Sequence, residues 1–141
     1  MNAILDLAIE RAKTSLGHEQ RADGHFVYEL EADATIPAEY VLLEHYLDRI
    51  DPELQRKIGV YLRRIQGNHA TNPGGWPLFH GGKIDLSASV KAYFALKALG
   101  DDPAAPHMAR ARAAILALGG AERSSVFTRI QLALFGAVAS P

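Results

Sequence analysis

Adjacent carboxylates are the first residues here that could do chemistry, because one carboxyl group of a pair can act as a general acid while the other acts as a general base. Asp101 and Asp102 form such a pair. The pair follows Gly100 and precedes Pro103, a combination typical of a short turn ahead of a helix. We therefore expect a solvated cap or turn pair rather than a catalytic acid.

A single carboxylate, Glu39, lies near the beginning of an apolar segment predicted to be a buried helix. A charge in that position is costly unless it is paired or close to the positive end of a helix. One interpretation is that the carboxylate simply favours its own helix N-terminus.

The histidines and glycines show no arrangement typical of a metal or phosphate site. His69 and His80 share a long loop, and His18 and His25 flank an earlier turn, none with His-Glu-x-x-His spacing. Gly81-Gly82-Lys83 lacks the upstream glycine of a P-loop. We expect solvated loop histidines, no metal ion and no cofactor.

Composition excludes further classes of protein. The chain has 141 residues, of which 48% are hydrophobic and 22% charged, which is enough for one packed domain. It has no cysteine, so disulfides, thiolate zinc sites and catalytic thiols are excluded. A net charge of −1 gives no field for binding nucleic acid. The absence of a long apolar run or a basic leader predicts a soluble, cytoplasmic protein.

Hydrophobic periodicity predicts an all-α chain of six main helices. Asp51 and Pro52 mark one helix start, as an N-cap followed by proline at the first helical position. Three segments carry an apolar stripe and one polar side, which predicts exposed helices: residues 3–20, 51–66 and 104–118. Three others are apolar nearly all round, which predicts buried helices: residues 36–50, 86–99 and 125–138.

Exposed and buried helices thus alternate, and the turns repeat as well. Gln20 begins a turn that contains Gly24 and Phe26, and Gln66 begins a turn that contains Gly75 and Trp76. A period near fifty residues with two helices per unit indicates an array of helical hairpins. A glutamine amide can tie a helix end to the following loop while the aromatic ring stacks over it.

A helix, a glutamine, a turn and then Gly-x-aromatic, repeated at this interval, resemble the QW motif of triterpene cyclases. Other stretches are similar to the N-terminal part of bacterial squalene–hopene cyclases, and the similarity runs from about Leu5 to Gly136. These stretches are residues 38–43, 74–82, 87–97 and 126–129.

The resemblance implies paired helices arranged in α/α toroids with inner and outer rings. Residues 1–141 would be the N-terminal part of one toroidal domain, an incomplete ring. The complete enzyme protonates squalene and cyclises it to hopene and hopanol in an apolar cavity, without a metal or organic cofactor. Its acid lies in an Asp-x-Asp-Asp motif, which this chain lacks. We therefore expect no cyclisation by this chain alone.

The resemblance also assigns roles to single residues. Glu39 matches a glutamate that lines the reaction cavity, which gives a second interpretation of its carboxylate. Lys91 stands where other members often have glutamate. The residues expected to have structural roles of the QW type are Gln20, Gly24, Phe26, Gln66, Gly75 and Trp76.

Two hypotheses about function follow. The chain is the N-terminal segment of a squalene–hopene cyclase, or it is a stand-alone, non-catalytic helical-repeat module that binds an isoprenoid or a partner protein. Squalene is a partner only in the complete enzyme, which in this family sits peripherally on the inner membrane surface. An incomplete ring leaves its inner helices uncovered, so we expect self-association through their apolar faces.

Overall fold

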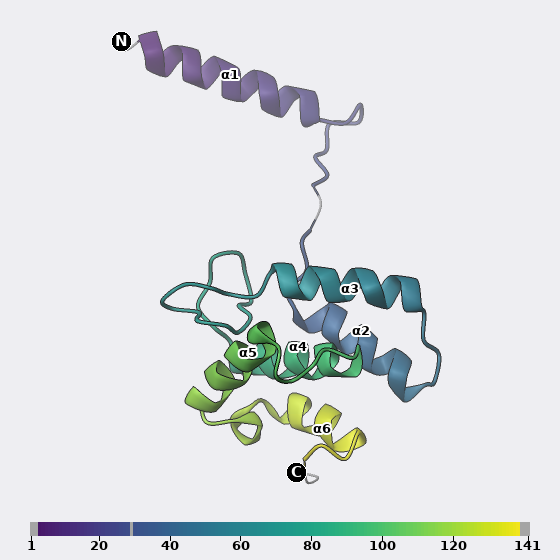
Figure 1. The fold of residues 1–141 in the computed structure, drawn as a ribbon. Coiled ribbons are helices and arrows are strands. Elements are labelled where there is room, and N and C mark those ends of the chain that lie inside the picture. The colour runs from purple at the N-terminus through teal and green to yellow at the C-terminus, as the bar shows by residue number, and fades with distance from the viewer. Residues whose placement is uncertain (1–2, 29, 139–141) are drawn as a thin grey trace. The chain divides into compact units, whose positions relative to one another are not determined.

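The computed structural model describes residues 3–28 and 30–138 and confirms an all-α fold, with six α-helices and no strand among these residues (Figure 1). A 3₁₀ turn, η1, precedes the last helix. The elements are α1 (Ala3–Glu19), α2 (Thr35–Tyr46), α3 (Pro52–Arg64), α4 (Leu86–Ala98), α5 (Pro106–Ala117), η1 (Ala121–Arg123) and α6 (Val126–Leu134).

The chain divides into two compact units, residues 1–31 and residues 32–141. The first unit contains α1, none of whose residues is buried. The remaining helices and the long loop between α3 and α4 form the second unit.

Side-chain caps explain where the two central helices begin. Asp51 precedes α3, and its Oδ1 accepts hydrogen bonds from the backbone N–H groups of Glu53 and Leu54, both at 3.0 Å. Asp85 does the same for α4, accepting from the N–H of Ala88 at 2.8 Å. Both caps satisfy donors that a helix start leaves without partners, so the predicted start at Asp51-Pro52 is confirmed.

The core of the second unit is built around α4, which contacts α2, α3, α5, η1 and α6. Its alanines allow the neighbouring helices to approach closely. The largest apolar side chains buried in this core come from α2, α3, α4, α5 and the long loop: Leu42, Leu62, Leu96, Met108 and Trp76.

Of the three helices predicted to be buried, only α4 fits the prediction. In α6 only Thr128 and Leu132 are buried, and the Phe127 side chain is 76% exposed. One face of α2 is exposed as well, with Ile36 and Leu43 on it. A helix that is apolar all round needs neighbours on every side. Within the second unit α2 packs on α3 and α4, and α6 packs on α4, so each keeps an exposed apolar face there.

Two of these helices are also shorter than predicted. The expected helix 36–50 ends at Tyr46, and Asp48 then adopts a φ of 51°, in the left-handed region. The expected helix 125–138 ends at Leu134, followed by Gly136 with a φ of 65°. The apolar residues that follow α2 and α6 belong to turns, and hydrophobic periodicity alone does not show where a helix ends.

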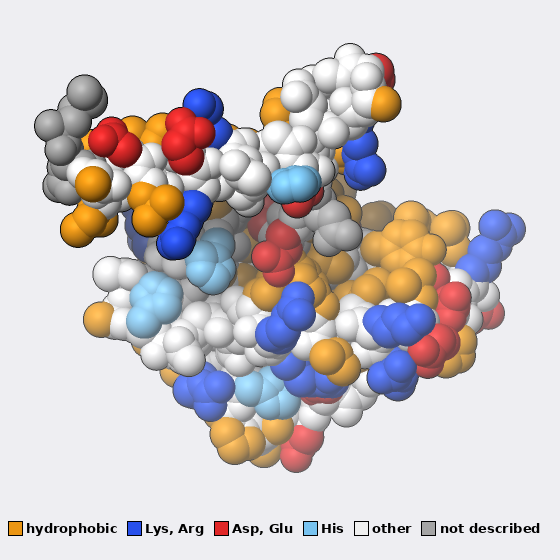
Figure 2. Space-filling model, turned by 90° about the horizontal axis from the view of Figure 1, so that it is seen from above, with side chains coloured by type: hydrophobic (Ala, Val, Ile, Leu, Met, Phe, Trp, Pro, Cys, Tyr) orange, Lys and Arg blue, Asp and Glu red, His pale blue; other side chains and the backbone are white. Residues whose placement is uncertain are grey.

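Apolar side chains therefore reach the surface. Figure 2 shows one face of the molecule, where hydrophobic side chains appear between basic and acidic ones. Within residues 3–28 and 30–138, none of the helices combines the length and the apolar character that crossing a bilayer requires.

Candidate functional site

Gln66 lies just after α3 and connects three segments. Its side-chain Nε2 donates to the carbonyl oxygen of Gly74 at 2.6 Å and to that of His107 at 2.9 Å. The first bond closes the loop that follows α3, and the second reaches the first turn of α5. One amide group thus ties the end of α3 to both its own loop and a helix 41 residues further along the chain.

Trp76, in the same loop, is completely buried. Its indole Nε1 donates to the carbonyl oxygen of Leu62 at 2.8 Å, near the end of α3. Its backbone N–H donates to Oγ of Ser89 in α4, also at 2.8 Å. The ring thus fills the space between the loop and the two helices, and the indole and backbone N–H groups of Trp76 both have hydrogen-bond acceptors.

The backbone of this loop passes very close to its neighbours. Asn72 is fully buried, and its Oδ1 accepts from the N–H of Gly75 at 2.9 Å. The N–H of Gly67 donates to the carbonyl oxygen of Gly75 at 2.8 Å. A Cβ added at Gly75 would lie 2.5 Å from Oγ of Ser89. Glycine is thus required at position 75 by lack of space, since its φ is not in the left-handed region.

The earlier turn in the first unit reproduces part of this geometry. Gln20 Nε2 donates to the carbonyl oxygen of Gly24 at 2.7 Å, and Gln20 pairs with Phe26 in an antiparallel bridge. The Phe26 ring, unlike Trp76, is exposed, and it stacks on Tyr28. The two turns share the amide-to-carbonyl bond and differ in what surrounds the aromatic ring.

Glu39 forms an ion pair that the sequence did not indicate. Its Oε1 accepts from Nζ of Lys91, which joins α2 to α4. The Lys91 side chain is 11% exposed, whereas that of Glu39 is 40% exposed. Glu39 makes no capping hydrogen bond at the start of α2. The partner lies 52 residues away in the chain, and only the packing of α2 on α4 brings the two together.

A second carboxylate in α2, Glu44, is almost fully buried. Its Oε2 accepts from Nε2 of Gln55 in α3 at 2.7 Å. The bond holds α2 and α3 together and satisfies a charge that would otherwise be costly to bury. Neither residue stands out in the sequence, because only the packing of α2 on α3 brings them together.

The prediction of a solvated Asp101 is wrong. Its side chain is only 8% exposed, and it forms a bidentate ion pair with the guanidinium of Arg63, with Nε and Oδ2 2.9 Å apart. His107 Nε2 lies 2.6 Å from the same Oδ2. Asp102 does match the expected turn role, accepting from the N–H of Ala104. The α4–α5 turn lies against α3, which covers Asp101 and not its neighbour.

The Arg63 guanidinium beside Asp101 holds the pKa of that carboxyl below its ordinary value of 3.8. Burial opposes this shift, and the hydrogen bond with His107 adds to it. A carboxyl group whose pKa is lower in the folded chain than in the unfolded chain stabilises the fold fully when the pH is above the unfolded-state pKa. This stabilisation is lost as the pH falls through the folded-state pKa.

We therefore expect Asp101→Asn to lower the free energy of unfolding by about 1–2 kcal/mol at pH 7, since a hydrogen-bonded ion pair is lost and Arg63 is partly solvated. The difference from the parent chain should shrink as the pH falls below 3.8. Urea unfolding at pH 7, 5 and 3 measures it. Asp102→Asn is the matched control with little effect. A difference for Asp101→Asn that stays constant with pH contradicts the assignment.

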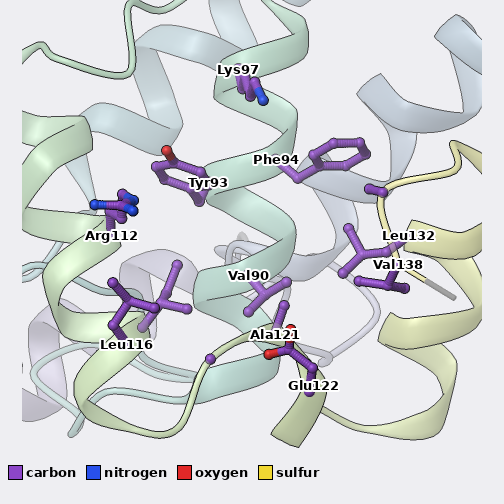
Figure 3. Close-up of a pocket in the computed structure, with 13 residues that line it drawn as sticks. Val90, Tyr93, Phe94, Lys97, Arg112, Leu116, Ala121, Glu122, Leu132 and Val138 are labelled. Carbon is purple, nitrogen blue, oxygen red and sulfur yellow. The ribbon is translucent and has the colours of Figure 1, made fainter.

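A cavity of about 290 Å³ lies between α4, α5, η1 and the end of the described chain (Figure 3). Most of the side chains that line it are apolar, and they include Val90, Ile115 and Leu132. Lys97, Arg112 and Glu122 also line it. Nothing in the sequence indicates this site, because its lining comes from four segments that only the fold brings together.

Metal ligands do not gather anywhere in the described part of the chain: no group of three or more histidine and acidic side chains there could hold an ion. His107, in α5, is paired with Asp101.

Comparison with known proteins gives consistent matches. Residues 9–140 match the family model described as the squalene-hopene cyclase N-terminal domain. The chain is 66% identical over 131 residues to a squalene–hopene cyclase of Zymomonas mobilis, covering 92% of this chain and 19% of that protein. It is 60% identical over 136 residues to one of Bradyrhizobium diazoefficiens, covering 96% and 20%. The chain thus spans about a fifth of the length of these relatives.

Proposed function

Since this chain belongs to the squalene–hopene cyclase N-terminal domain family, we propose that it acts as the N-terminal segment of an enzyme that cyclises squalene to hopene. The observation that carries the proposal is the 66% identity to the Zymomonas mobilis enzyme over 131 residues. Its helices would be hairpins of an incomplete α/α ring that the rest of such an enzyme completes. The Asp-x-Asp-Asp acid would come from outside these 141 residues.

Glu39 is our candidate for a residue that lines the substrate cavity of the complete enzyme. It is three residues after Ile36 and four before Leu43, so the three share one face of α2. Ile36 and Leu43 are exposed apolar residues, which makes this a surface suited to a hydrocarbon. The ion pair with Lys91 of α4 would hold the Glu39 carboxylate in place beside that surface.

The residues of the two turns would act in positioning rather than in chemistry. Gln66, Gly75 and Trp76 tie α3, α4 and α5 together through buried and partly buried hydrogen bonds, which supports a structural role. Gln20, Gly24 and Phe26 would do the same on a smaller scale in the first unit.

A chimeric enzyme tests the proposed function. The matched residues of this chain replace the corresponding segment of the Zymomonas mobilis squalene–hopene cyclase, and hopene is measured by mass spectrometry after incubation with squalene. We expect hopene from the chimera and none from the isolated chain above a heat-killed control, because the chain lacks the acid. A folded chimera without hopene formation contradicts the proposal. Turnover by the isolated chain contradicts the assignment of the acid to another segment.

We also propose that the isolated chain self-associates through the exposed apolar faces of α2 and α6. Exposed side chains on these faces include Tyr46, Phe127 and Ile130. Apolar surface of this kind drives association when no other segment covers it. Light scattering on the same preparation should give a mass above that of one 15.3 kDa chain, and a stable monomer counts against this part. The family resemblance supports a cytoplasmic enzyme on the inner membrane surface.

A further inference from the structure

The cavity beside α4 has a shape and lining that the cyclisation of a hydrocarbon does not explain. Its volume of about 290 Å³ is just below the roughly 300–1,000 Å³ typical of ligand pockets. Val90 and Phe94 of α4, Ile115 and Leu116 of α5, and Leu132 of α6 supply apolar walls. A slender apolar chain fits such walls.

One end of this cavity carries two cations and a phenol. Tyr93 and Lys97 are four residues apart on α4, so both face the cavity from one side of that helix. Arg112 lies on α5, which returns beside α4 after a short connection and so brings Arg112 toward the Tyr93–Lys97 end. Figure 3 shows these three residues on one side of the cavity and Glu122 on the other.

These donors have no partner among the residues that the structure describes. Lys97 and Arg112 are exposed and form no ion pair there, and the half-buried Tyr93 makes no side-chain hydrogen bond there. Together with Glu122, the charged lining carries a net charge of +1. One negative charge at the basic end would neutralise it.

We propose that this cavity binds an amphiphilic monoanion, a medium-chain fatty carboxylate, with its alkyl chain between α4, α5 and α6 and its carboxylate beside Lys97, Arg112 and the Tyr93 hydroxyl. Squalene has no group that these donors could bind, so the site is separate from that of the proposed cyclisation. The inference does not depend on the proposed function, and either can fail without the other.

Decanoate is the probe, titrated into the full 141-residue chain by isothermal titration calorimetry. Decanol and decyltrimethylammonium have the same chain length with a neutral and a positive head, and both should bind at least tenfold more weakly. From hexanoate to decanoate the affinity should rise about fourfold for each methylene that enters the cavity, because burying a CH₂ contributes a fixed increment. Equal binding of decanoate and decanol, or no binding of decanoate, overturns the proposal.

Two pairs of substitutions separate the site from general charge effects. Lys97→Gln with Arg112→Gln should weaken decanoate binding about tenfold, because each partly solvated ion pair contributes about threefold. The matched control is Arg49→Gln with Lys83→Gln, which removes two exposed positive charges outside the lining and should leave the affinity unchanged. An equal loss in both pairs indicates non-specific attraction and contradicts the site.

A substitution that fills the cavity gives an independent check. Ala121 is half-buried and lines the cavity from η1, so Ala121→Leu should occlude it. Decanoate binding should then fall at least tenfold while the circular dichroism spectrum and unfolding midpoint stay those of the parent. Unchanged binding by a folded Ala121→Leu chain places decanoate elsewhere and overturns the proposal.

Discussion

Trp76→Ala is expected to lower the free energy of unfolding of the second unit by about 3–5 kcal/mol, the cost of removing a large buried aromatic ring. The ring is fully buried in the core, between the loop, α3 and α4. The carbonyl of Leu62 also loses its indole donor. Small domains are stable by only about 5–15 kcal/mol. Urea unfolding should therefore show that the variant keeps only a small part of the parent's free energy of unfolding.

Two controls identify the cause of this loss. Trp76→Phe keeps most of the buried ring but lacks the indole N–H, so it should lose clearly less than Trp76→Ala and still fall below the parent. Phe79→Ala removes an aromatic ring from the same loop, where it is 70% exposed, and should change stability by less than about 0.5 kcal/mol. A small effect of Trp76→Ala, comparable to that of Phe79→Ala, contradicts a structural role for Trp76.

Gly75→Ala is expected to cost about 1–3 kcal/mol, because a single added methyl group overpacks the contact between the loop and α4. The new Cβ would overlap the end of the Ile84 side chain and lie 2.5 Å from Oγ of Ser89. Ile84 can turn aside, but Ser89 is buried and its hydroxyl accepts the hydrogen bond from the Trp76 N–H. The methyl group therefore displaces a hydrogen-bonded group.

The control is a glycine with free space around it. Gly17 lies in α1, where a Cβ would have no heavy atom within 4 Å, so Gly17→Ala should leave the unfolding transition of the second unit unchanged. Circular dichroism should show equal or slightly higher helicity, since alanine favours helix over glycine. If Gly75→Ala unfolds at the same urea concentration as the parent, the close approach to Ser89 is not a constraint.

Local patterns predicted the helices well because their determinants are local. Asp51 and Pro52 mark the start of α3 through bonds within three residues. The glycines after Gln66 exclude a helix there, and the structure has a loop. The ends of α2 and α6 were placed too late, because apolar residues beyond a helix look the same in a periodic pattern.

Burial was predicted less well than helicity. An apolar circumference indicates what a helix could bury, but burial itself depends on which neighbours are present. For α4 those neighbours are α2, α3, α5 and α6, and for α6 they cover only one side. The neighbours within the second unit therefore leave apolar faces of α2 and α6 exposed.

The sequence by itself determined the all-α class, the helix starts, the repeated glutamine–glycine–aromatic turns and the resemblance to the cyclase family. These depend on spacing within a few residues or on long collinear similarity. Only the tertiary structure decided the pairing of Glu39 with Lys91, the burial of Asp101 against Arg63 and the cavity beside α4. The residues of each pair lie 38 or 52 positions apart, and no local rule relates side chains at such separations. The packing of whole helices brings them together, because it places their side chains within bonding distance.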